Sequence, residues 1–255
     1  MTEDLGGRTV LLTGASKGIG AATARALGDA GAHVVAHFGS DDAGAREAVG
    51  RVPNERKLLL QADLTDPGEA RSLWDAAVAW RGRVDVLVNN AAVMEEAPLE
   101  ATDEEWLRAW QRSLQVNVLA PALLTRAAVR HFSDRAGGVL ITMSSWVAQR
   151  GPSTESLIAY AASKAAVKAL TQTIARHRAK ENILAYVVTP GVVRTRMSEL
   201  AAASVGGEEA VSARLAMGEW VPPEEVADLV AFLAAGHVRH LTGATLDVNG
   251  ATYVR

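Results

Sequence analysis

The chain has 255 residues, of which 49% are hydrophobic and 22% charged, which suits a globular α/β protein with one substantial core. Its formal net charge of −3 argues against nucleic acid or an anionic membrane as a partner, and the absence of cysteine excludes disulfides, thiolate nucleophiles and cysteine-based metal sites, so no metal is expected. The polar start MTEDLGGR is unlike a signal peptide, and no apolar run approaches the roughly 18 residues that span a bilayer, which predicts a cytoplasmic protein.

Short apolar runs alternate with amphipathic stretches along the whole chain. The runs that predict buried strands span residues 9–14, 32–38, 57–63, 84–90, 138–145, 183–191 and 244–250. Helical patterns lie between most of them, over 21–30, 67–80, 104–132 and 159–179. Because continuous apolar strands separated by helices are typical of a parallel sheet covered on both faces, we predict one doubly wound α/β domain over 1–255, with a mainly parallel seven-stranded sheet.

One late segment breaks the strand–helix alternation. Residues 198–217 contain Gly206-Gly207 near their middle and show no clear period. We expect a flap that covers the substrate around 196–220, and a plain surface insertion is the alternative.

The stretch VLLTGASKGIGAATARAL, residues 10–27, indicates a strand, a glycine turn and a helix. Gly14, Gly18 and Gly20 let the backbone turn tightly and approach a pyrophosphate, whose charge then lies at the helix N-terminus. The spacing is G-x-x-x-G-x-G rather than G-x-G-x-x-G, but the position between the first strand and first helix favours a dinucleotide site.

The same turn also contains G-x-S-x-G, the nucleophile elbow of α/β-hydrolases, with Ser16 as the nucleophile. Against this alternative, no strand precedes the first one to build an oxyanion loop, and no H-G-G-G-like stretch exists. No histidine stands in an obvious late catalytic loop after a matching acid, although His237 and His240 keep the alternative open.

Tyr160 and Lys164 lie one helical turn apart in the alanine-rich stretch AYAASKAAV, residues 159–167, so a helix places them on the same face. An ammonium about 4 Å from a phenol, at an effective dielectric near 20, favours the phenolate by roughly 4 kcal/mol. That corresponds to about three pKa units and would bring a tyrosine pKa of about 10 near neutrality, where it serves as a general acid/base. An incidental pair on a surface helix is the alternative for this motif alone.

Further motifs stand in a fixed order along the chain: NNAA at 89–92, Asn117, SS at 144–145, and PG at 190–191. With the glycine turn and the Tyr–Lys pair, they make the chain resemble the classical short-chain dehydrogenase/reductase family over nearly its whole length, and within it 3-oxoacyl-acyl-carrier-protein reductases. The resemblance implies a Rossmann-fold oxidoreductase that moves hydride between a nicotinamide cofactor and a small carbonyl or alcohol, commonly as a homotetramer, with a dimer as the alternative.

The resemblance also implies roles for individual residues. Tyr160 would be the general acid/base, Lys164 would lower its pKa and hold the nicotinamide ribose, and Ser145 would hydrogen-bond the substrate oxygen. Asn117 would position a water that leads protons towards Lys164, and Ser144 would only cap or turn the strand end. The residues implied in cofactor binding are Gly14, Ser16, Lys17, Gly18, Ile19, Gly20, Phe38, Ser40, Asp63, Leu64, Asn90, Ala91, Tyr160, Lys164, Pro190, Gly191, Val193 and Thr195.

The end of the second strand bears on the choice between NADP(H) and NAD(H). An acid that holds the ribose 2′-hydroxyl is common there in NAD-binding proteins, and the family alignment puts Phe38 at that position. Lys17 offers positive charge and Ser40 a hydroxyl, which favours NADP(H). Asp41 and Asp42 leave NAD(H) possible, because either carboxylate could reach the ribose.

Three features depart from the usual family pattern. Ala92 stands where glycine is common, and we expect it to be tolerated; the distance from Ser145 to Tyr160 is two residues longer than usual. Asn117 lies inside a helical run, where its side chain favours a local kink. Trp106 and Trp110 are four residues apart and are expected in the core or a subunit interface.

By family position, a largely apolar substrate pocket is expected, which suits a carbonyl compound of modest size. Its predicted lining is Val93, Met94, Trp146, Val147, Leu157, Val192, Met197 and Trp220, with the polar Glu95, Glu96, Gln149 and Arg150 nearby. A non-catalytic NADP-sensing module on the same fold is a second alternative, which the presence of the serine, tyrosine and lysine disfavours.

Overall fold

The computed structural model describes residues 4–203 and 205–254. Its strands form one seven-stranded sheet in which all neighbours are parallel, in the order β3-β2-β1-β4-β5-β6-β7. Their bounds are β1 (Thr9–Leu12), β2 (His33–Phe38), β3 (Lys57–Gln61), β4 (Val86–Asn89), β5 (Gly138–Met143), β6 (Ile183–Pro190) and β7 (Thr245–Val248). The predicted doubly wound sheet is confirmed, and each strand lies within the apolar run that predicted it.

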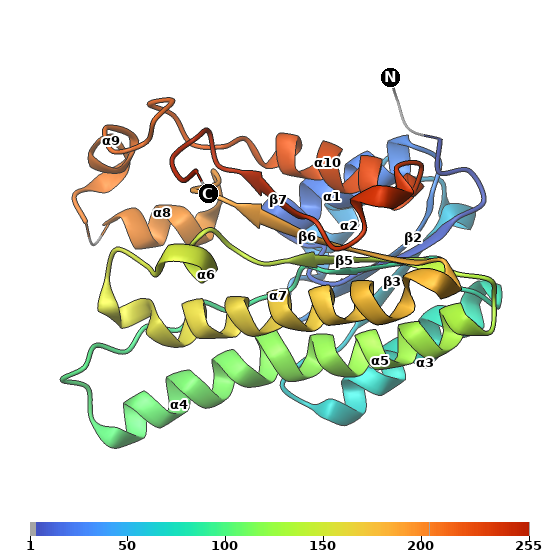
Figure 1. Cartoon of the computed structure of the whole chain (residues 1–255), viewed down its shortest axis with the longest axis horizontal. Coiled ribbons are helices and arrows are strands. Elements are labelled where there is room, and N and C mark those ends of the chain that lie inside the picture. Colours follow the sequence, from blue (N-terminus) through green and yellow to red (C-terminus); the bar gives the residue numbers. More distant parts are fainter. Residues whose placement is uncertain (1–3, 204, 255) are drawn as a thin grey trace.

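Helices cover both faces of the sheet (Figure 1). Their bounds are α1 (Gly18–Asp29), α2 (Asp42–Ala48), α3 (Pro67–Arg81), α4 (Asp103–Leu114), α5 (Ala120–Ser133), α6 (Val147–Arg150), α7 (Ile158–Arg178), α8 (Arg196–Ala203), α9 (Gly207–Ser212) and α10 (Pro223–Ala235). One core contains buried residues of α1 and α10, and the other contains buried residues of α3, α5 and α7. The two cores lie on opposite faces of the sheet, which explains why the strands are apolar on both sides.

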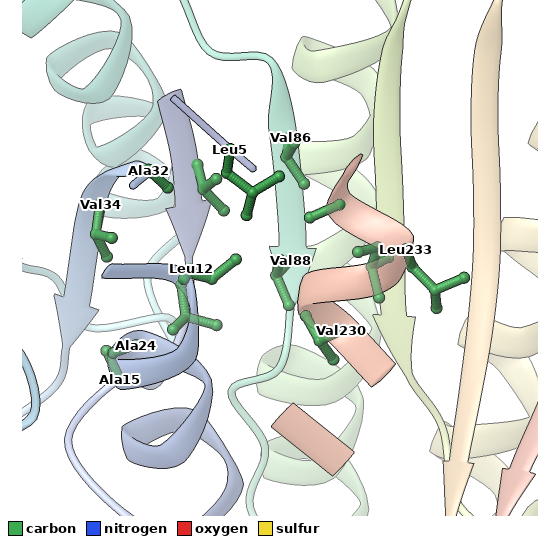
Figure 2. Packing of buried hydrophobic residues seen from close by; sticks show 14 of the residues in the cluster. Leu5, Leu12, Ala15, Ala24, Ala32, Val34, Val86, Val88, Val230 and Leu233 are labelled. Atoms are coloured by element: carbon green, nitrogen blue, oxygen red, sulfur yellow. The ribbon is translucent and has the colours of Figure 1, made fainter. Parts of the chain in front are cut away.

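Aliphatic side chains fill the space between the sheet and its first and last long helices (Figure 2). Leu12 and Val88 come from adjacent strands, and Val230 and Leu233 come from α10. The small side chain of Ala24 lets α1 approach the strands closely, and all five residues are buried. This packing fixes the first helix, and therefore the glycine turn that precedes it, against the sheet.

The helix predicted over 104–132 is not continuous. A π-helical turn, Gln115–Leu119, separates α4 from α5 and carries the buried Asn117. Pro121 follows four residues after Asn117 and has no N–H, so the Asn117 carbonyl lacks the donor that an α-helix would provide. A local irregularity is thus present at the predicted position in the form of this π-helical turn, and the missing N–H of Pro121 accounts for it.

The segment predicted as a flap contains two short helices, α8 and α9, at one end of the molecule (Figure 1). The predicted range 196–220 includes residue 204, which lies outside the described residues. Arg194 at the base of this segment pairs with Glu208 of α9 at 2.7 Å, and Val193 bridges to Val221 at its far end. Both ends of the segment are therefore anchored beside β6.

Among residues 4–203 and 205–254, no helix combines the length and the apolar character that a membrane span requires.

A capping substitution tests the local account of the fold. Asp66 accepts hydrogen bonds from the N–H groups of Gly68 and Glu69, at 2.6 and 3.4 Å, and so begins α3. We expect Asp66→Ala to lower the free energy of unfolding by about 1 kcal/mol in urea denaturation, because it leaves these N–H groups without their acceptor. Asp75→Ala, on the exposed side of the same helix, is the control. Equal effects of the two substitutions would contradict the capping role.

Candidate active site

A cleft of about 1080 Å³ opens at the carboxyl ends of the strands. It lies where strand order reverses, between β1 and β4, which is the usual ligand position in an open parallel sheet. All residues that the sequence predicted as catalytic or cofactor-binding line this cleft, except Phe38 and Asn117. The cleft is also lined by residues that the sequence did not predict, among them His37, Gln61, Thr65, Glu69, Arg112 and Met143.

The glycine turn leaves room for a ligand because side chains are missing from it. Gly14 and Gly18 have φ values of 70° and 51°, which side-chain-bearing residues rarely adopt. A Cβ on Gly14 would lie 2.9 Å from the Cα of Ala91, and one on Gly18 would lie 2.8 Å from a methyl of Thr195. The turn, with the N-terminus of α1 behind it, therefore fits the pyrophosphate of a dinucleotide.

Two polar side chains hold the glycine turn against the end of β4. The Asn90 amide donates to the carbonyls of Thr13 and Gly14, at 2.9 and 3.1 Å. The Thr13 hydroxyl accepts the backbone N–H groups of Asn90 and Ala91, at 2.9 and 3.1 Å. Thr13 was not predicted, although its position immediately before the first glycine was an available signal. Ala92, next in the chain, does not have a positive φ, so alanine fits there as expected.

Tyr160 and Lys164 both face the cleft from α7, as their helical spacing predicted. The Lys164 Nζ lies 5.7 Å from the centroid of the Tyr160 ring and donates to the Met143 carbonyl at 2.9 Å. Ser145 follows β5, is buried, and hydrogen-bonds the Tyr160 side chain. A hydroxyl, a phenol and an ammonium thus gather at one end of the cleft.

Burial governs the protonation of this pair, contrary to the expectation from the sequence. It raises the pKa of Tyr160 from 10.0 to about 12, although the hydrogen bond with Ser145 acts in the opposite direction. Burial also lowers the pKa of Lys164 from 10.5 to about 8. The predicted near-neutral pKa of Tyr160 is therefore wrong for this structure, since the loss of water around the phenol raises the pKa more than the hydrogen bond with Ser145 lowers it.

A chain of hydrogen bonds fixes the position of α7 beneath the cleft. The Ser144 hydroxyl donates to the Lys164 carbonyl at 2.8 Å, which gives it the structural role that the sequence suggested. The Ser163 hydroxyl donates to the Tyr160 carbonyl at 2.7 Å and accepts the Asn117 amide at 3.0 Å. Ser163 was not predicted, because small polar residues are common in helices and a serine there carries little signal of its own.

The Asn117 side chain does not line the cleft. Its oxygen accepts the Val93 N–H at 2.9 Å, and its amide donates to the Val93 carbonyl at 2.8 Å as well as to Ser163. These bonds tie the π-helical turn to the loop after β4 on one side and to α7 on the other. The side chain thus aligns the two elements that flank Tyr160.

At the other end of the cleft, one residue that the sequence predicted to line it does not do so. Phe38 is buried away from the cleft, whereas His37 lines it. Lys17 and Asp41 both line the cleft and form an ion pair at 3.2 Å. Asp63 lies at the same end, and hydrogen bonds from Thr65 lower the pKa of its carboxyl.

Only part of the predicted substrate pocket lines the cleft. Val93 and Met197 do, together with the unpredicted Met143 and Val116. Trp220 is buried and lies under Arg194, whose guanidinium carbon is 5.5 Å from its ring centroid, so its predicted place in the pocket is wrong. The remaining predicted residues are Met94, Trp146, Val147, Leu157 and Val192, and they lie outside this lining.

The hydrolase alternative lacks a base for Ser16. His37 lines the same cleft, but the Gly14 N–H and the Ala62 carbonyl engage its two ring nitrogens. His237 and His240 follow α10, which ends at Gly236 beside the amino ends of β5 and β6, at the edge of the sheet opposite the cleft. Neither histidine is placed to activate Ser16.

Comparisons with known proteins agree with this geometry. The family model described as enoyl-(acyl carrier protein) reductase matches residues 14–251. A 3beta-hydroxysteroid dehydrogenase of Eggerthella lenta is 38% identical over 253 residues, which cover 98% of this chain and 95% of the relative. A 3-oxoacyl-[acyl-carrier-protein] reductase of Escherichia coli is 32% identical and covers 97% and 98%.

A solved structure extends the likeness to three dimensions. The crystal structure of a short-chain dehydrogenase from Burkholderia cenocepacia in complex with NADP superposes with a TM-score of 0.86 at 31% identity, over 98% of this chain and 99% of that one. The chain therefore belongs to the classical short-chain dehydrogenase/reductase family. It is an NAD(P)-dependent oxidoreductase that transfers hydride and acts on alcohol or carbonyl groups.

The lowered pKa of Lys164 predicts a pH-dependent stability difference. Between pH 8 and 9.5 the folded protein releases this proton while the unfolded chain keeps it, so the wild type gains stability as pH rises. Lys164→Met lacks this gain, and we expect its free energy of unfolding relative to wild type to fall by about 2 kcal/mol from pH 7 to pH 9.5.

Urea denaturation of the cofactor-free protein at both pH values measures this difference. Lys168→Met, one turn further along α7, is the matched control and is expected to track the wild type. A constant difference between Lys164→Met and wild type across the two pH values would contradict the burial effect.

Proposed function

We propose that this protein is an NADP(H)-dependent carbonyl reductase in which Tyr160 is the general acid/base. The observation that carries this proposal is the meeting of Ser145, Tyr160 and Lys164 at one end of a cleft whose other end is the glycine turn. Pro190 and Gly191 line the cleft next to this group, where the nicotinamide would be held. When bound, the nicotinamide supplies or accepts the hydride.

The protonation states of the site favour reduction at neutral pH. With a pKa of about 12, Tyr160 carries its proton and can donate it to a carbonyl oxygen as that oxygen gains negative charge. Ser145 would donate a second hydrogen bond to the same oxygen. Lys164, with a pKa of about 8, is mostly an ammonium at pH 7 and would favour the tyrosinate that remains after proton transfer.

Asn117 would contribute through its main chain rather than its side chain. Its amide is fully engaged by Val93 and Ser163, whereas its carbonyl has no donor at Pro121. A water held by that carbonyl would restore the proton of Tyr160 by way of Lys164. This assignment keeps the predicted relay and ascribes it to the backbone carbonyl of Asn117.

The adenosine end of the cleft supports a preference for NADP(H). Lys17 is 70% exposed on its side chain, so its ammonium can reach a 2′-phosphate, and Ser40 offers a hydroxyl beside it. The Asp41 carboxylate would repel a phosphate, but the ion pair with Lys17 partly neutralises the charge of this carboxylate. Asp42 pairs with Arg46 at 2.6 Å and lies outside the cleft lining.

A homo-oligomer is part of the proposal, a tetramer or a dimer. Leu107, Leu114 and Leu119 expose 54%, 38% and 49% of their surface on α4 and the π-helical turn. Trp106 and Trp110 are half-buried on the same helix, with ring centroids 6.1 Å apart. An apolar surface of this kind is typical of a subunit interface.

Substitution of the proposed acid tests the mechanism. We expect Tyr160→Phe to lower kcat at least hundredfold on a panel of ketones, measured by the loss of NADPH absorbance, because the phenolic proton is lost. NADPH binding, measured by fluorescence titration, should remain. Tyr253→Phe is the matched control and should keep wild-type turnover. Undiminished turnover in Tyr160→Phe would remove this residue from the mechanism.

Substitution at the glycine turn tests the cofactor preference. We expect Lys17→Ala to raise KM for NADPH about tenfold and leave KM for NADH nearly unchanged, because only NADPH carries the 2′-phosphate. Lys180→Ala, on the surface after α7, is the control. If the wild type has a lower KM for NADH than for NADPH at equal turnover, the NADP(H) preference is wrong.

A further inference from the structure

His37 is a buried histidine in the cofactor cleft, and both of its ring nitrogens are engaged by backbone groups. It stands near the end of β2, is 2% exposed, and lines the cleft. The Gly14 N–H donates to its Nδ1 at 3.1 Å, and its Nε2 lies 3.0 Å from the Ala62 carbonyl oxygen. The side chain therefore joins the turns that follow β1 and β3, which lie on either side of β2 in the sheet.

These two bonds define the chemical form of the ring. Because the Gly14 N–H is a donor, Nδ1 must be unprotonated, and because the Ala62 carbonyl is an acceptor, Nε2 must carry the hydrogen. Only the neutral Nε2–H tautomer satisfies both partners. In a histidinium, an Nδ1–H would face the Gly14 N–H, and one of these two buried donors would lose its acceptor.

The partners of His37 belong to two walls of the cleft. Gly14 is the first residue of the glycine turn and packs closely against Ala91, because a Cβ on Gly14 would lie 2.9 Å from the Ala91 Cα, and both residues line the cleft. Ala62 immediately precedes Asp63 and Leu64, which line the adenosine end. A displacement of either partner would move a wall against which the cofactor is expected to lie.

We propose that neutral His37 is a positioning residue for the nicotinamide cofactor, which holds the glycine turn and the segment after β3 at the separation that the adenosine half requires. This inference rests on the proposed function and adds a residue that acts on the cofactor through the backbone of Gly14 and Ala62. His37 lies at the end of the cleft away from Tyr160, so it affects binding and leaves the chemical step unchanged.

The pH dependence of cofactor affinity distinguishes this positioning role from a purely structural one, because it follows the protonation of His37. The charged side chains that line the cleft together with His37 are Lys17, Asp41, Asp63, Glu69, Arg112, Lys164 and Arg196. The pKa of His37 lies below its ordinary 6.5, because burial disfavours the cation and the Ala62 carbonyl only partly opposes this. Cofactor affinity should therefore fall only as pH drops below about 6.5.

The test uses the full-length protein and measures Kd for NADPH by fluorescence titration from pH 5 to pH 8. His37→Leu removes both hydrogen bonds, whereas His37→Asn keeps an oxygen that can accept the Gly14 N–H and does not titrate. His33→Asn is the matched control, on the same strand but at its amino end, away from the cleft. Thermal unfolding verifies that each variant is folded at the titration temperature.

We expect His37→Leu to raise Kd and KM for NADPH about tenfold at pH 7.5, with kcat at saturating NADPH within twofold of wild type. His37→Asn should recover most of the affinity, and the ratio of wild-type to His37→Asn Kd should rise as pH falls below 6.5. This ratio removes the titration of the cofactor's own phosphate, whose pKa is about 6.

Two outcomes would overturn the inference. One is a folded His37→Leu variant with wild-type Kd for NADPH, and the other is a Kd ratio between wild type and His37→Asn that stays constant with pH. If the wild type binds neither NADPH nor NADH, the proposed function itself fails, so the two failures are distinguishable.

Discussion

The site depends on the burial of an ammonium group at the end of a parallel sheet. Lys164 is 4% exposed and has one backbone acceptor, the Met143 carbonyl, together with the face of the Tyr160 ring. Removal of water from a cation is costly, and these two contacts only partly offset the loss, which is why the pKa of the ammonium falls to about 8. The surrounding structure must hold this group in place at the expense of stability, as is common at functional sites.

Hydrogen bonds to backbone groups, rather than charges, hold Lys164 and Tyr160 in place. Ser144 holds the Lys164 carbonyl, Ser163 holds the Tyr160 carbonyl, and Asn117 connects Ser163 to the loop after β4. The same principle operates at the other end of the cleft, where His37 holds backbone groups of two turns. Neutral groups fix positions without adding charge, so they leave the electrostatic field inside the cleft to its charged lining residues, among them Lys164 and the Lys17–Asp41 ion pair.

Much of the fold could be predicted from the sequence, because apolar strands on both faces of a sheet are visible as continuous hydrophobic runs. Site residues that follow strand ends were also predictable, since parallel strands bring their carboxyl ends together. Phe38 and His37 show where this reasoning stops. Side chains alternate along a strand, so a shift of one residue exchanges the cleft-lining side chain for a buried one. Ser163 and Thr13 were not predicted as site residues, because their hydrogen bonds depend on contacts between segments that are distant in the chain.

The pKa of Tyr160 illustrates a second limit of sequence reasoning, and it also bears on the proton transfer of the proposed reaction. The helical spacing gives the distance between phenol and ammonium, from which attraction alone can be calculated, but the depth of burial comes only from the packing of α7 against β5. With burial included, the cofactor-free site at pH 7 holds a neutral phenol above a cation. A neutral phenol can donate a proton to a carbonyl but cannot accept one from an alcohol. In the proposed reaction, the resting phenol therefore already carries the proton that carbonyl reduction consumes, whereas alcohol oxidation would first require the phenol to lose the proton that burial retains.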